Sequence, residues 1–189
     1  MLRNTRLGYG WMASVLHWTI AILIVGQWIL GKAMKNVADQ RLSFDLIQWH
    51  KSFGLLILAL AILRLAWRLL NPRPALPADM SGLERRAAGW THRSLYVLMV
   101  LLPLSGWAIA STTVLEIPTF AFYLFVVPDL PMTRSDAGEA LWTSVHQVLG
   151  WLLLVFVALH VAAALRHHFL LRDGILLRML KPETPPDGQ

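Results

Sequence analysis

The segment Leu141–Leu165, LWTSVHQVLGWLLLVFVALHVAAAL, contains no Asp, Glu, Lys or Arg. It is longer than the ~20 residues that an α-helix needs to cross the hydrocarbon core of a membrane. His146 and His160 lie within it, and on an α-helix their spacing gives a rise of about 21 Å and brings the side chains to within ~40° of each other. The two imidazoles therefore share one helix face at different depths. Because ionisable side chains inside membrane spans usually serve a function, this spacing suggests two metal centres stacked across a bilayer.

The composition of the whole chain agrees with a membrane protein. Hydrophobic residues make up 56% of the 189 residues, charged residues only 15%, and the mean hydropathy is +0.53; soluble domains are less apolar and more highly charged. Arg64 and Arg68 interrupt the end of the second apolar segment, but long arginine side chains near a helix end can reach the headgroups. We therefore predict an all-α integral membrane protein, a single four-helix transmembrane bundle. Its expected spans are residues 8–31, 50–70, 93–115 and 141–167, with an outer loop at 116–140 and a flexible tail at 181–189.

The basic residues predict the orientation of the bundle. Of the 17 Lys and Arg residues, 12 lie next to the ends of the spans on the side where both termini lie. By the positive-inside rule both termini are cytoplasmic. The net charge of +6 is thereby explained by topology, and a nucleic-acid partner is not expected. The first apolar segment is expected to remain in the protein, because it holds His17 and Gln27 and lacks a small-x-small cleavage site before Lys32.

Two level pairs of histidines follow from this topology. His50 opens the second span and His146 the fourth from the outer side, whereas His17 and His160 both lie near the cytoplasmic end. The chain has no cysteine, which excludes disulfides, thiolate metal sites and covalent haem attachment. The pairs therefore predict two non-covalent b-type haems, each held by two imidazoles through the haem iron.

Three further residues are candidates for contacts with these haems. Gly54 and Gly150 each follow a predicted ligand by one helical turn, where a missing side chain leaves room for a porphyrin edge. Close helix contact explains them equally well. Arg64 lies on the face of His50 at the depth of the inner haem, which fits a propionate partner, with snorkelling or topology as the alternative.

The remaining histidines have simpler explanations. His92 begins the third span in basic surroundings that indicate a membrane interface, although it could replace His17 as the inner ligand. His167 and His168 follow the fourth span, where solvated polar residues are expected; a role of His167 in an inner substrate pocket is the alternative. In the outer loop, the apolar segment 117–127 is too short to span and predicts an interfacial helix or a lid.

Over nearly its whole length, the sequence resembles the bacterial cytochrome b561 family of four-helix dihaem membrane proteins. The matching motifs are Leu16–Trp18 (LHW), Trp49–Gly54 (WHKSFG), Ser144–Gln147 (SVHQ) with Gly150, and Leu159–Phe169 (LHVAAALRHHF). The resemblance implies that His17, His50, His146 and His160 ligate two b haems. It also implies electron transfer in the bacterial inner membrane, with quinone or a redox protein as partner. One branch of the family oxidises superoxide and reduces ubiquinone, and this superoxide:ubiquinone oxidoreductase activity is the leading hypothesis.

The hypothesis assigns residues to both membrane faces but names no catalytic side chain. Superoxide would be attracted by basic residues near the outer mouth, Lys32, Lys35, Arg41 and Lys51, although the acidic outer loop opposes this field. Quinone would bind at the inner face near Arg73, Arg64 and His167. Two alternatives stay open: a membrane-anchor cytochrome that passes electrons between the quinone pool and a partner redox protein, and a cofactor-free bundle whose histidines are satisfied core residues.

Overall fold

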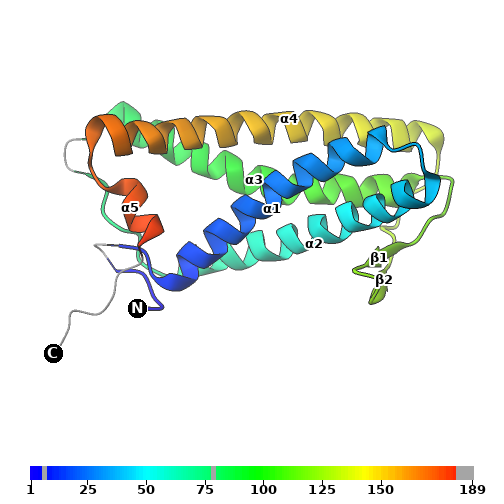
Figure 1. Cartoon of the computed structure of the whole chain (residues 1–189), viewed down its shortest axis with the longest axis horizontal. Helices are drawn as coiled ribbons and strands as arrows, with labels where there is room; N and C mark the ends of the chain where they lie inside the picture. Colours follow the sequence, from blue (N-terminus) through cyan, green and yellow to red (C-terminus); the bar gives the residue numbers. More distant parts are fainter. Residues whose placement is uncertain (6–7, 78–79, 182–189) are drawn as a thin grey trace.

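A computed structural model describes residues 1–5, 8–77 and 80–181 as a bundle of four long helices (Figure 1). The predicted tail at 181–189 lies outside the described residues beyond Lys181. The long helices are α1 (Trp11–Asn36), α2 (Gln40–Leu70), α3 (Gly82–Thr112) and α4 (Asp136–Arg166), and all four are long and apolar enough to cross a membrane. Their presence agrees with the four predicted spans.

Short elements mark the two ends of the bundle. Strands β1 (Thr119–Ala121) and β2 (Phe125–Val127) form a hairpin at one end, called here the hairpin end. The N-terminal residues and α5 (Ile175–Leu180) lie at the opposite end, called here the terminal end (Figure 1). A π-helical segment, η1 (His167–Leu171), connects α4 toward α5.

The helices extend past the apolar spans that the sequence predicts. Helix α2 begins at Gln40 rather than near residue 50, because the Asp39 side chain accepts a hydrogen bond from the Leu42 N–H at 2.7 Å and caps the helix there. Ser81 and Glu84 form a capping box at the start of α3, and Ser135 caps α4. Apolar length thus indicates the membrane crossing, whereas polar caps decide where the helix begins.

Two expectations for the outer side change with these boundaries. The connection between α1 and α2 is only residues 37–39, so Lys32 and Lys35 belong to α1, and Arg41 and Lys51 belong to α2. The connection between α3 and α4, which the sequence analysis predicts as an outer loop at 116–140, runs from 113 to 135, because α4 already begins at Asp136.

The predicted interfacial helix at 117–127 is wrong, since this segment forms the antiparallel β-hairpin, with Thr119 opposite Val127 and Ala121 opposite Phe125. The alternative, a lid over that end of the bundle, stays a prediction. Phe122 and Tyr123 adopt left-handed backbone angles, φ 50° and 57°, that a helix does not allow. Side chains of α2 pair with its backbone: the Gln48 amide donates to Pro118 O and accepts from Phe120 N, both at 3.0 Å. Ser52 donates to Phe120 O at 3.0 Å. The hairpin is therefore fastened to α2 on both sides of His50.

Helix packing is uneven around the bundle. The closely packed pairs are α3 with α4, α1 with α2, and α2 with α3. Each of the four long helices contributes to one buried apolar cluster, which contains Ile20, Ala61, Leu98, Met99 and Leu153. Within the described helices, α4 packs closely along its backbone against neither α1 nor α2. Helix α4, which carries His146 and His160, is thus held apart from α1 with His17 and from α2 with His50.

Candidate functional site

The structure brings both predicted histidine pairs together across these wider spaces. His50 of α2 faces His146 of α4 at the hairpin end, with ring centres 6.2 Å apart and the ring planes at 75°. His17 of α1 faces His160 of α4 at the terminal end, with ring centres 6.0 Å apart at 78°. When one imidazole binds on each side of a metal atom, the distance between the ring centres contains two metal–nitrogen bonds of about 2 Å and half the width of each ring. These lengths add up to about 6 Å. Both pairs therefore have the separation that an iron atom between two imidazoles requires.

The donor set favours haem over a bare metal ion. Among residues 1–5, 8–77 and 80–181, no group of three or more His, Cys, Asp or Glu side chains is arranged to hold a metal ion. Each pair supplies only two nitrogen ligands. A porphyrin supplies the other four ligands of a six-coordinate iron, so two facing imidazoles complete a haem site and leave a bare ion underligated.

Hydrogen bonds orient His146 toward the space between the helices. Its Nδ1 lies 2.9 Å from Ser105 Oγ and 3.1 Å from Leu102 O, both on α3. A proton on Nδ1 can be donated to the Leu102 carbonyl, which leaves Nε2 free as a metal ligand, and metal-ligating histidines usually donate their other ring N–H in this way. His50 differs, because its Nδ1 is buried without a hydrogen-bond partner. A buried nitrogen that lacks a partner fits a site designed for a bound group.

Two glycines that the sequence analysis missed lie against these histidines. A Cβ on Gly106 would lie 3.2 Å from His146 Cε1, and a Cβ on Gly31 would lie 3.4 Å from His50 Cε1. The predicted glycines have other neighbours: a Cβ on Gly54 would meet Gln27 Nε2 at 3.3 Å, and one on Gly150 would reach Leu102 at 4.0 Å. The neighbours of Gly54 and Gly150 suit the alternative of close helix contact, and their contact with a porphyrin stays a prediction.

A third histidine joins the pair at the terminal end. The ring centre of His92 lies 5.3 Å from that of His160. His92 belongs to α3, which packs closely on α4, so the wider space that suits a macrocycle lies on the His17 side of His160. Arg64 also reaches this level, where its Nη1 donates to Ala13 O at 3.0 Å. The contact of Arg64 with a haem propionate stays a prediction.

The residues predicted to line a quinone pocket are both at the terminal end but differ in burial. His167 is 9% exposed, and its Nδ1 contacts the Asp173 carboxylate. Asp173 also accepts from the Ile175 N–H at 3.2 Å, which ties His167 to the start of α5. Arg73 is exposed in the connection between α2 and α3. No direct hydrogen bond joins Arg73 to His167 in the described chain.

The basic residues at the hairpin end have distinct surroundings. The Lys32 ammonium lies 5.1 Å from the ring centre of Trp28 and 5.6 Å from that of Trp151, a cation–π arrangement that links α1 and α4. Lys35 is exposed and close enough to His50 and His146 to act on them electrostatically. Lys51 is partly buried and lies in the field of Asp129. Arg41 is exposed near the start of α2.

Part of the opposing acidic charge of the outer connection is paired. Arg134 bridges Glu116 at 2.5 Å and Asp129 at 2.8 Å, and its hydrogen bonds to Asp129 and Glu116 raise the pKa of Arg134. Asp136 and Glu139 lie in the first turn of α4, where negative charge is favoured by the helix dipole. Arg134 thus offsets one of the four acidic charges, and the segment keeps a net negative charge.

Comparison with known proteins agrees with this geometry. Residues 8–182 match the family model of prokaryotic cytochrome b561. The chain is 31% identical over 188 residues to the Escherichia coli protein "Cytochrome b561 homolog 2", covering 98% of this chain and 97% of that one. It is 26% identical to "Probable superoxide oxidase CybB" of Yersinia pestis, covering 91% and 95% of the two chains. It is 25% identical to "Cytochrome b562" of Cereibacter sphaeroides, covering 93% and 96%. The family match confirms the resemblance, implies b-type haem and identifies an oxidoreductase-type membrane electron-transfer protein: the chain belongs to the prokaryotic cytochrome b561 family.

Proposed function

We propose that this protein is a dihaem cytochrome of the inner membrane that oxidises superoxide to dioxygen and reduces ubiquinone. The observation that carries the proposal is the pair of facing imidazoles at each end of the bundle, 6.2 Å and 6.0 Å between ring centres. When bound, two haems would supply one-electron carriage between the two ends. The printed name of the Yersinia pestis relative, a probable superoxide oxidase, supports the choice of reductant.

The proposal places the terminal end in the cytoplasm, with both termini on that side. This orientation rests on the distribution of basic residues, 12 of 17 on the side of the termini. Superoxide is then oxidised at the outer, hairpin end. Ubiquinone is reduced at the inner, terminal end.

Attraction of the anion falls to the residues of the hairpin end. Lys35 acts on His50 and His146 from an exposed position, and Lys32, Arg41 and Lys51 add positive charge to the same end. A positive mouth raises the local concentration of a small anion and its association rate. The pairing of Glu116 and Asp129 with Arg134 limits their repulsion. Each superoxide gives up one electron and leaves as dioxygen.

Quinone chemistry needs two electrons and two protons for each ubiquinol formed, so two superoxide ions are consumed. We assign proton supply and binding of the quinone oxygens to the terminal end, with His167 and Arg73 as candidates. The Nδ1 of His167 is engaged by Asp173, so its Nε2 is the nitrogen available to a ligand. Arg64 is assigned to a haem propionate.

Haem content provides the first experiment. The pyridine haemochrome spectrum of the detergent-purified protein should give about two b haems per chain. His146→Ala and His160→Ala should each remove one haem, whereas His168→Ala, a histidine beside Phe169, should remove none. One haem in the unaltered protein would mean that one pair is misassigned, and none would end the proposal.

Activity separates the enzyme from the electron-transfer alternative. Purified protein in nanodiscs should reduce a short-chain ubiquinone when superoxide is supplied. The assay measures quinol formation, which added catalase should not abolish. A dihaem protein that fails this assay but accepts electrons from a co-purified redox partner would instead be a membrane-anchor cytochrome.

A further inference from the structure

The turn of the β-hairpin and the strand after it carry large apolar side chains in exposed positions. We call residues 122–126 the hairpin tip. Within it, Leu124, Phe125 and Val126 are 81%, 62% and 55% exposed. Apolar side chains that are exposed together usually mark an interaction surface. In Figure 1 the hairpin lies alongside α2 and not beyond the ends of the helices, so this surface faces sideways from the bundle.

The contacts with α2 show that the tip points toward the middle of the bundle. Helix α2 begins at the hairpin end, and its Gln48 side chain pairs with Pro118 O and Phe120 N. Ser52 lies one helical turn further along α2. Its hydroxyl donates to Phe120 O at 3.0 Å and accepts from the Phe122 N–H at 2.9 Å. The chain from 118 to 122 therefore runs along α2, away from the helix end and inward.

The tip reaches the level of the hairpin-end histidines. The ring centre of Phe122 lies 5.9 Å from that of Trp49 and 5.3 Å from that of Phe53, and these two residues precede and follow His50 on α2. His50 faces His146, which lies about 7.5 Å inside the charge-free stretch of α4. A level inside that stretch belongs to the hydrocarbon region of a membrane that the four helices cross.

The backbone of the hairpin is paired in the way that lipid surroundings demand. In hydrocarbon an unpaired N–H or C=O is costly, so non-helical backbone at that depth needs partners from the protein. Gln48 and Ser52 supply them to residues 118–122, and these two side chains are 0% and 1% exposed. At the turn, the Leu124 N–H donates to Ala121 O at 2.9 Å. In water, the same backbone groups could pair with solvent instead.

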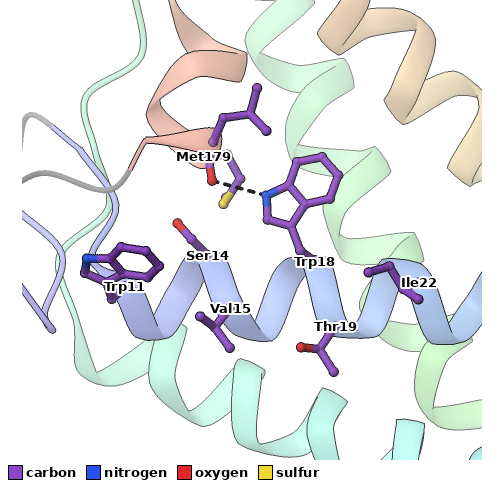
Figure 2. A pocket seen from close by; sticks show the side chains of 8 residues that line it. Trp11, Ser14, Val15, Trp18, Thr19, Ile22 and Met179 are labelled. Carbon is purple, nitrogen blue, oxygen red and sulfur yellow. Dashed lines mark hydrogen bonds between the residues drawn. The ribbon is translucent and has the colours of Figure 1, made fainter.

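The terminal end offers a contrast. The short element there is a helix, α5, whose backbone hydrogen bonds run along its own axis. Figure 2 shows how α5 is tied to α1, through the Trp18 indole N–H that donates to Met179 O at 3.2 Å. The hairpin instead receives two polar side chains from α2, each bound to two of its backbone groups. This is the pairing that a β element needs beside a membrane-spanning helix.

Tyr123 indicates the direction of the aqueous phase. Its ring stacks on that of Phe120, with ring centres 6.2 Å apart, and its hydroxyl donates to the Asp45 carboxylate at 2.7 Å. Asp45 lies about 10 Å nearer to the start of α2 than Ser52 does. Tyrosines at a membrane interface place the ring among apolar groups and direct the hydroxyl toward water. Tyr123 therefore reaches back from the tip toward the membrane surface.

We propose that the hairpin is a membrane-inserted anchor, whose tip enters the acyl chains of the leaflet at the hairpin end while the Tyr123 hydroxyl stays at the headgroups. The partner of the exposed apolar surface is thus lipid. Because Gln48 and Ser52 fasten the hairpin to α2 on both sides of His50, the anchor fixes the depth of that histidine below the membrane surface.

The test uses the absence of cysteine from the chain, so that single-cysteine variants report single positions. Leu124→Cys at the tip is compared with Leu115→Cys, 70% exposed in the connection before the hairpin, and with Val155→Cys, 52% exposed on α4. In haem-loaded protein in phosphatidylcholine nanodiscs, a charged maleimide should modify Leu124→Cys at least about tenfold more slowly than Leu115→Cys, because a charged reagent enters hydrocarbon at a high cost. The rate should resemble that of Val155→Cys, and all three variants should react equally in SDS.

Two further measurements support this comparison. A phospholipid with a diazirine in the upper half of one acyl chain, photolysed in nanodiscs of the unaltered protein, should label the hairpin tip. Ser52→Ala in the Leu124→Cys background removes backbone partners of the hairpin and should speed the maleimide reaction. Ser144→Ala is the matched control, since Ser144 donates to a backbone carbonyl within α4 at 2.9 Å.

Each outcome decides the proposal. Slow modification together with lipid labelling of the tip would support insertion. Modification of Leu124→Cys as fast as that of Leu115→Cys would overturn it and favour a lid in water. Slow modification without lipid labelling, with a disulfide trapped between two copies of Leu124→Cys, would overturn it in favour of a second copy of the chain. An unchanged rate in Ser52→Ala would overturn the role of α2. These readouts involve neither superoxide nor quinone, so they decide this proposal separately from the proposed function.

Discussion

Ser105 gives a direct test of how His146 is held. Its hydroxyl is 2% exposed, donates to Leu102 O at 2.7 Å and lies 2.9 Å from His146 Nδ1. Ser105→Ala removes this contact but leaves His146 Nδ1 within 3.1 Å of Leu102 O. Loss of a hydrogen-bond partner that orients a ligating histidine typically costs about 10–100-fold in affinity, or about 1.4–2.7 kcal/mol. Because one of the two partners remains, we expect the lower end of this range, about tenfold.

The assay is transfer of haem from the detergent-purified protein to excess apomyoglobin. About half of the haem should leave roughly tenfold faster in Ser105→Ala, and the other half, held by His17 and His160, should leave at the unaltered rate. Ser111→Ala is the control, since Ser111 is also buried in α3 and donates to Trp107 O at 2.8 Å. Faster loss of both haems, or a rate equal to that of Ser111→Ala, would refute the reasoning that Ser105 orients a haem ligand.

Further predictions follow from individual contacts. Gly106→Ala should reduce the haem content of the hairpin-end site, because its Cβ would lie 3.2 Å from His146 Cε1, whereas Gly26→Ala, with open space around its Cβ, should not; pyridine haemochrome spectra compare them. His92→Ala should retain two haems and His17→Ala only one, and the reverse result would make His92 the ligand. Gln48→Ala should leave Pro118 O and Phe120 N unpaired, at a cost of about 2–4 kcal/mol, and limited proteolysis at residues 122–124 should become faster than in Asn36→Ala. The hydrogen bond to Asp45 raises the pKa of Tyr123. This contact is therefore complete below the ordinary tyrosine pKa of about 10 and is lost as pH rises through the higher pKa of the folded protein. Proteolysis of the hairpin should accelerate in that pH range, and Tyr123→Phe should remove the pH dependence.

The sequence predicts the features that repeat along one helix. Apolar length revealed four long helices, and the spacing of His146 and His160 placed two side chains on one face at two depths. The level of His17 and His50 followed from helical rise and the direction of each span. These inferences need only local geometry, and the structure brings the same four side chains into two pairs.

The features that sequence reasoning missed depend on partners far apart along the chain. The hairpin is fastened by Gln48 and Ser52, which precede their backbone partners by about 70 residues. These contacts cannot be read from segment 117–127 itself, although its aromatic and β-branched residues are typical of strands. Ser105 and Gly106 meet His146 from another helix, and nothing in their own neighbourhood indicates a role. The predicted helices were too short because N-capping residues, Asp39 and Ser81, and not hydropathy, determine where α2 and α3 begin.

The middle of the bundle has few ionisable side chains that can carry protons. No Asp, Glu, Lys, Arg or His occurs at positions 18–31, 52–63, 94–112 or 147–159, which lie within α1, α2, α3 and α4 respectively. The buried cluster around Ala61, Met99 and Leu153 fills this region with apolar side chains. Proton transfer needs a chain of ionisable groups or water, and at these positions Tyr96 is the one ionisable side chain, which is too few to form such a chain. Under the proposed function, electrons from the hairpin end cross without a chain of ionisable side chains beside them, and we assign entry of the ubiquinol protons to the terminal end, where His167 lies.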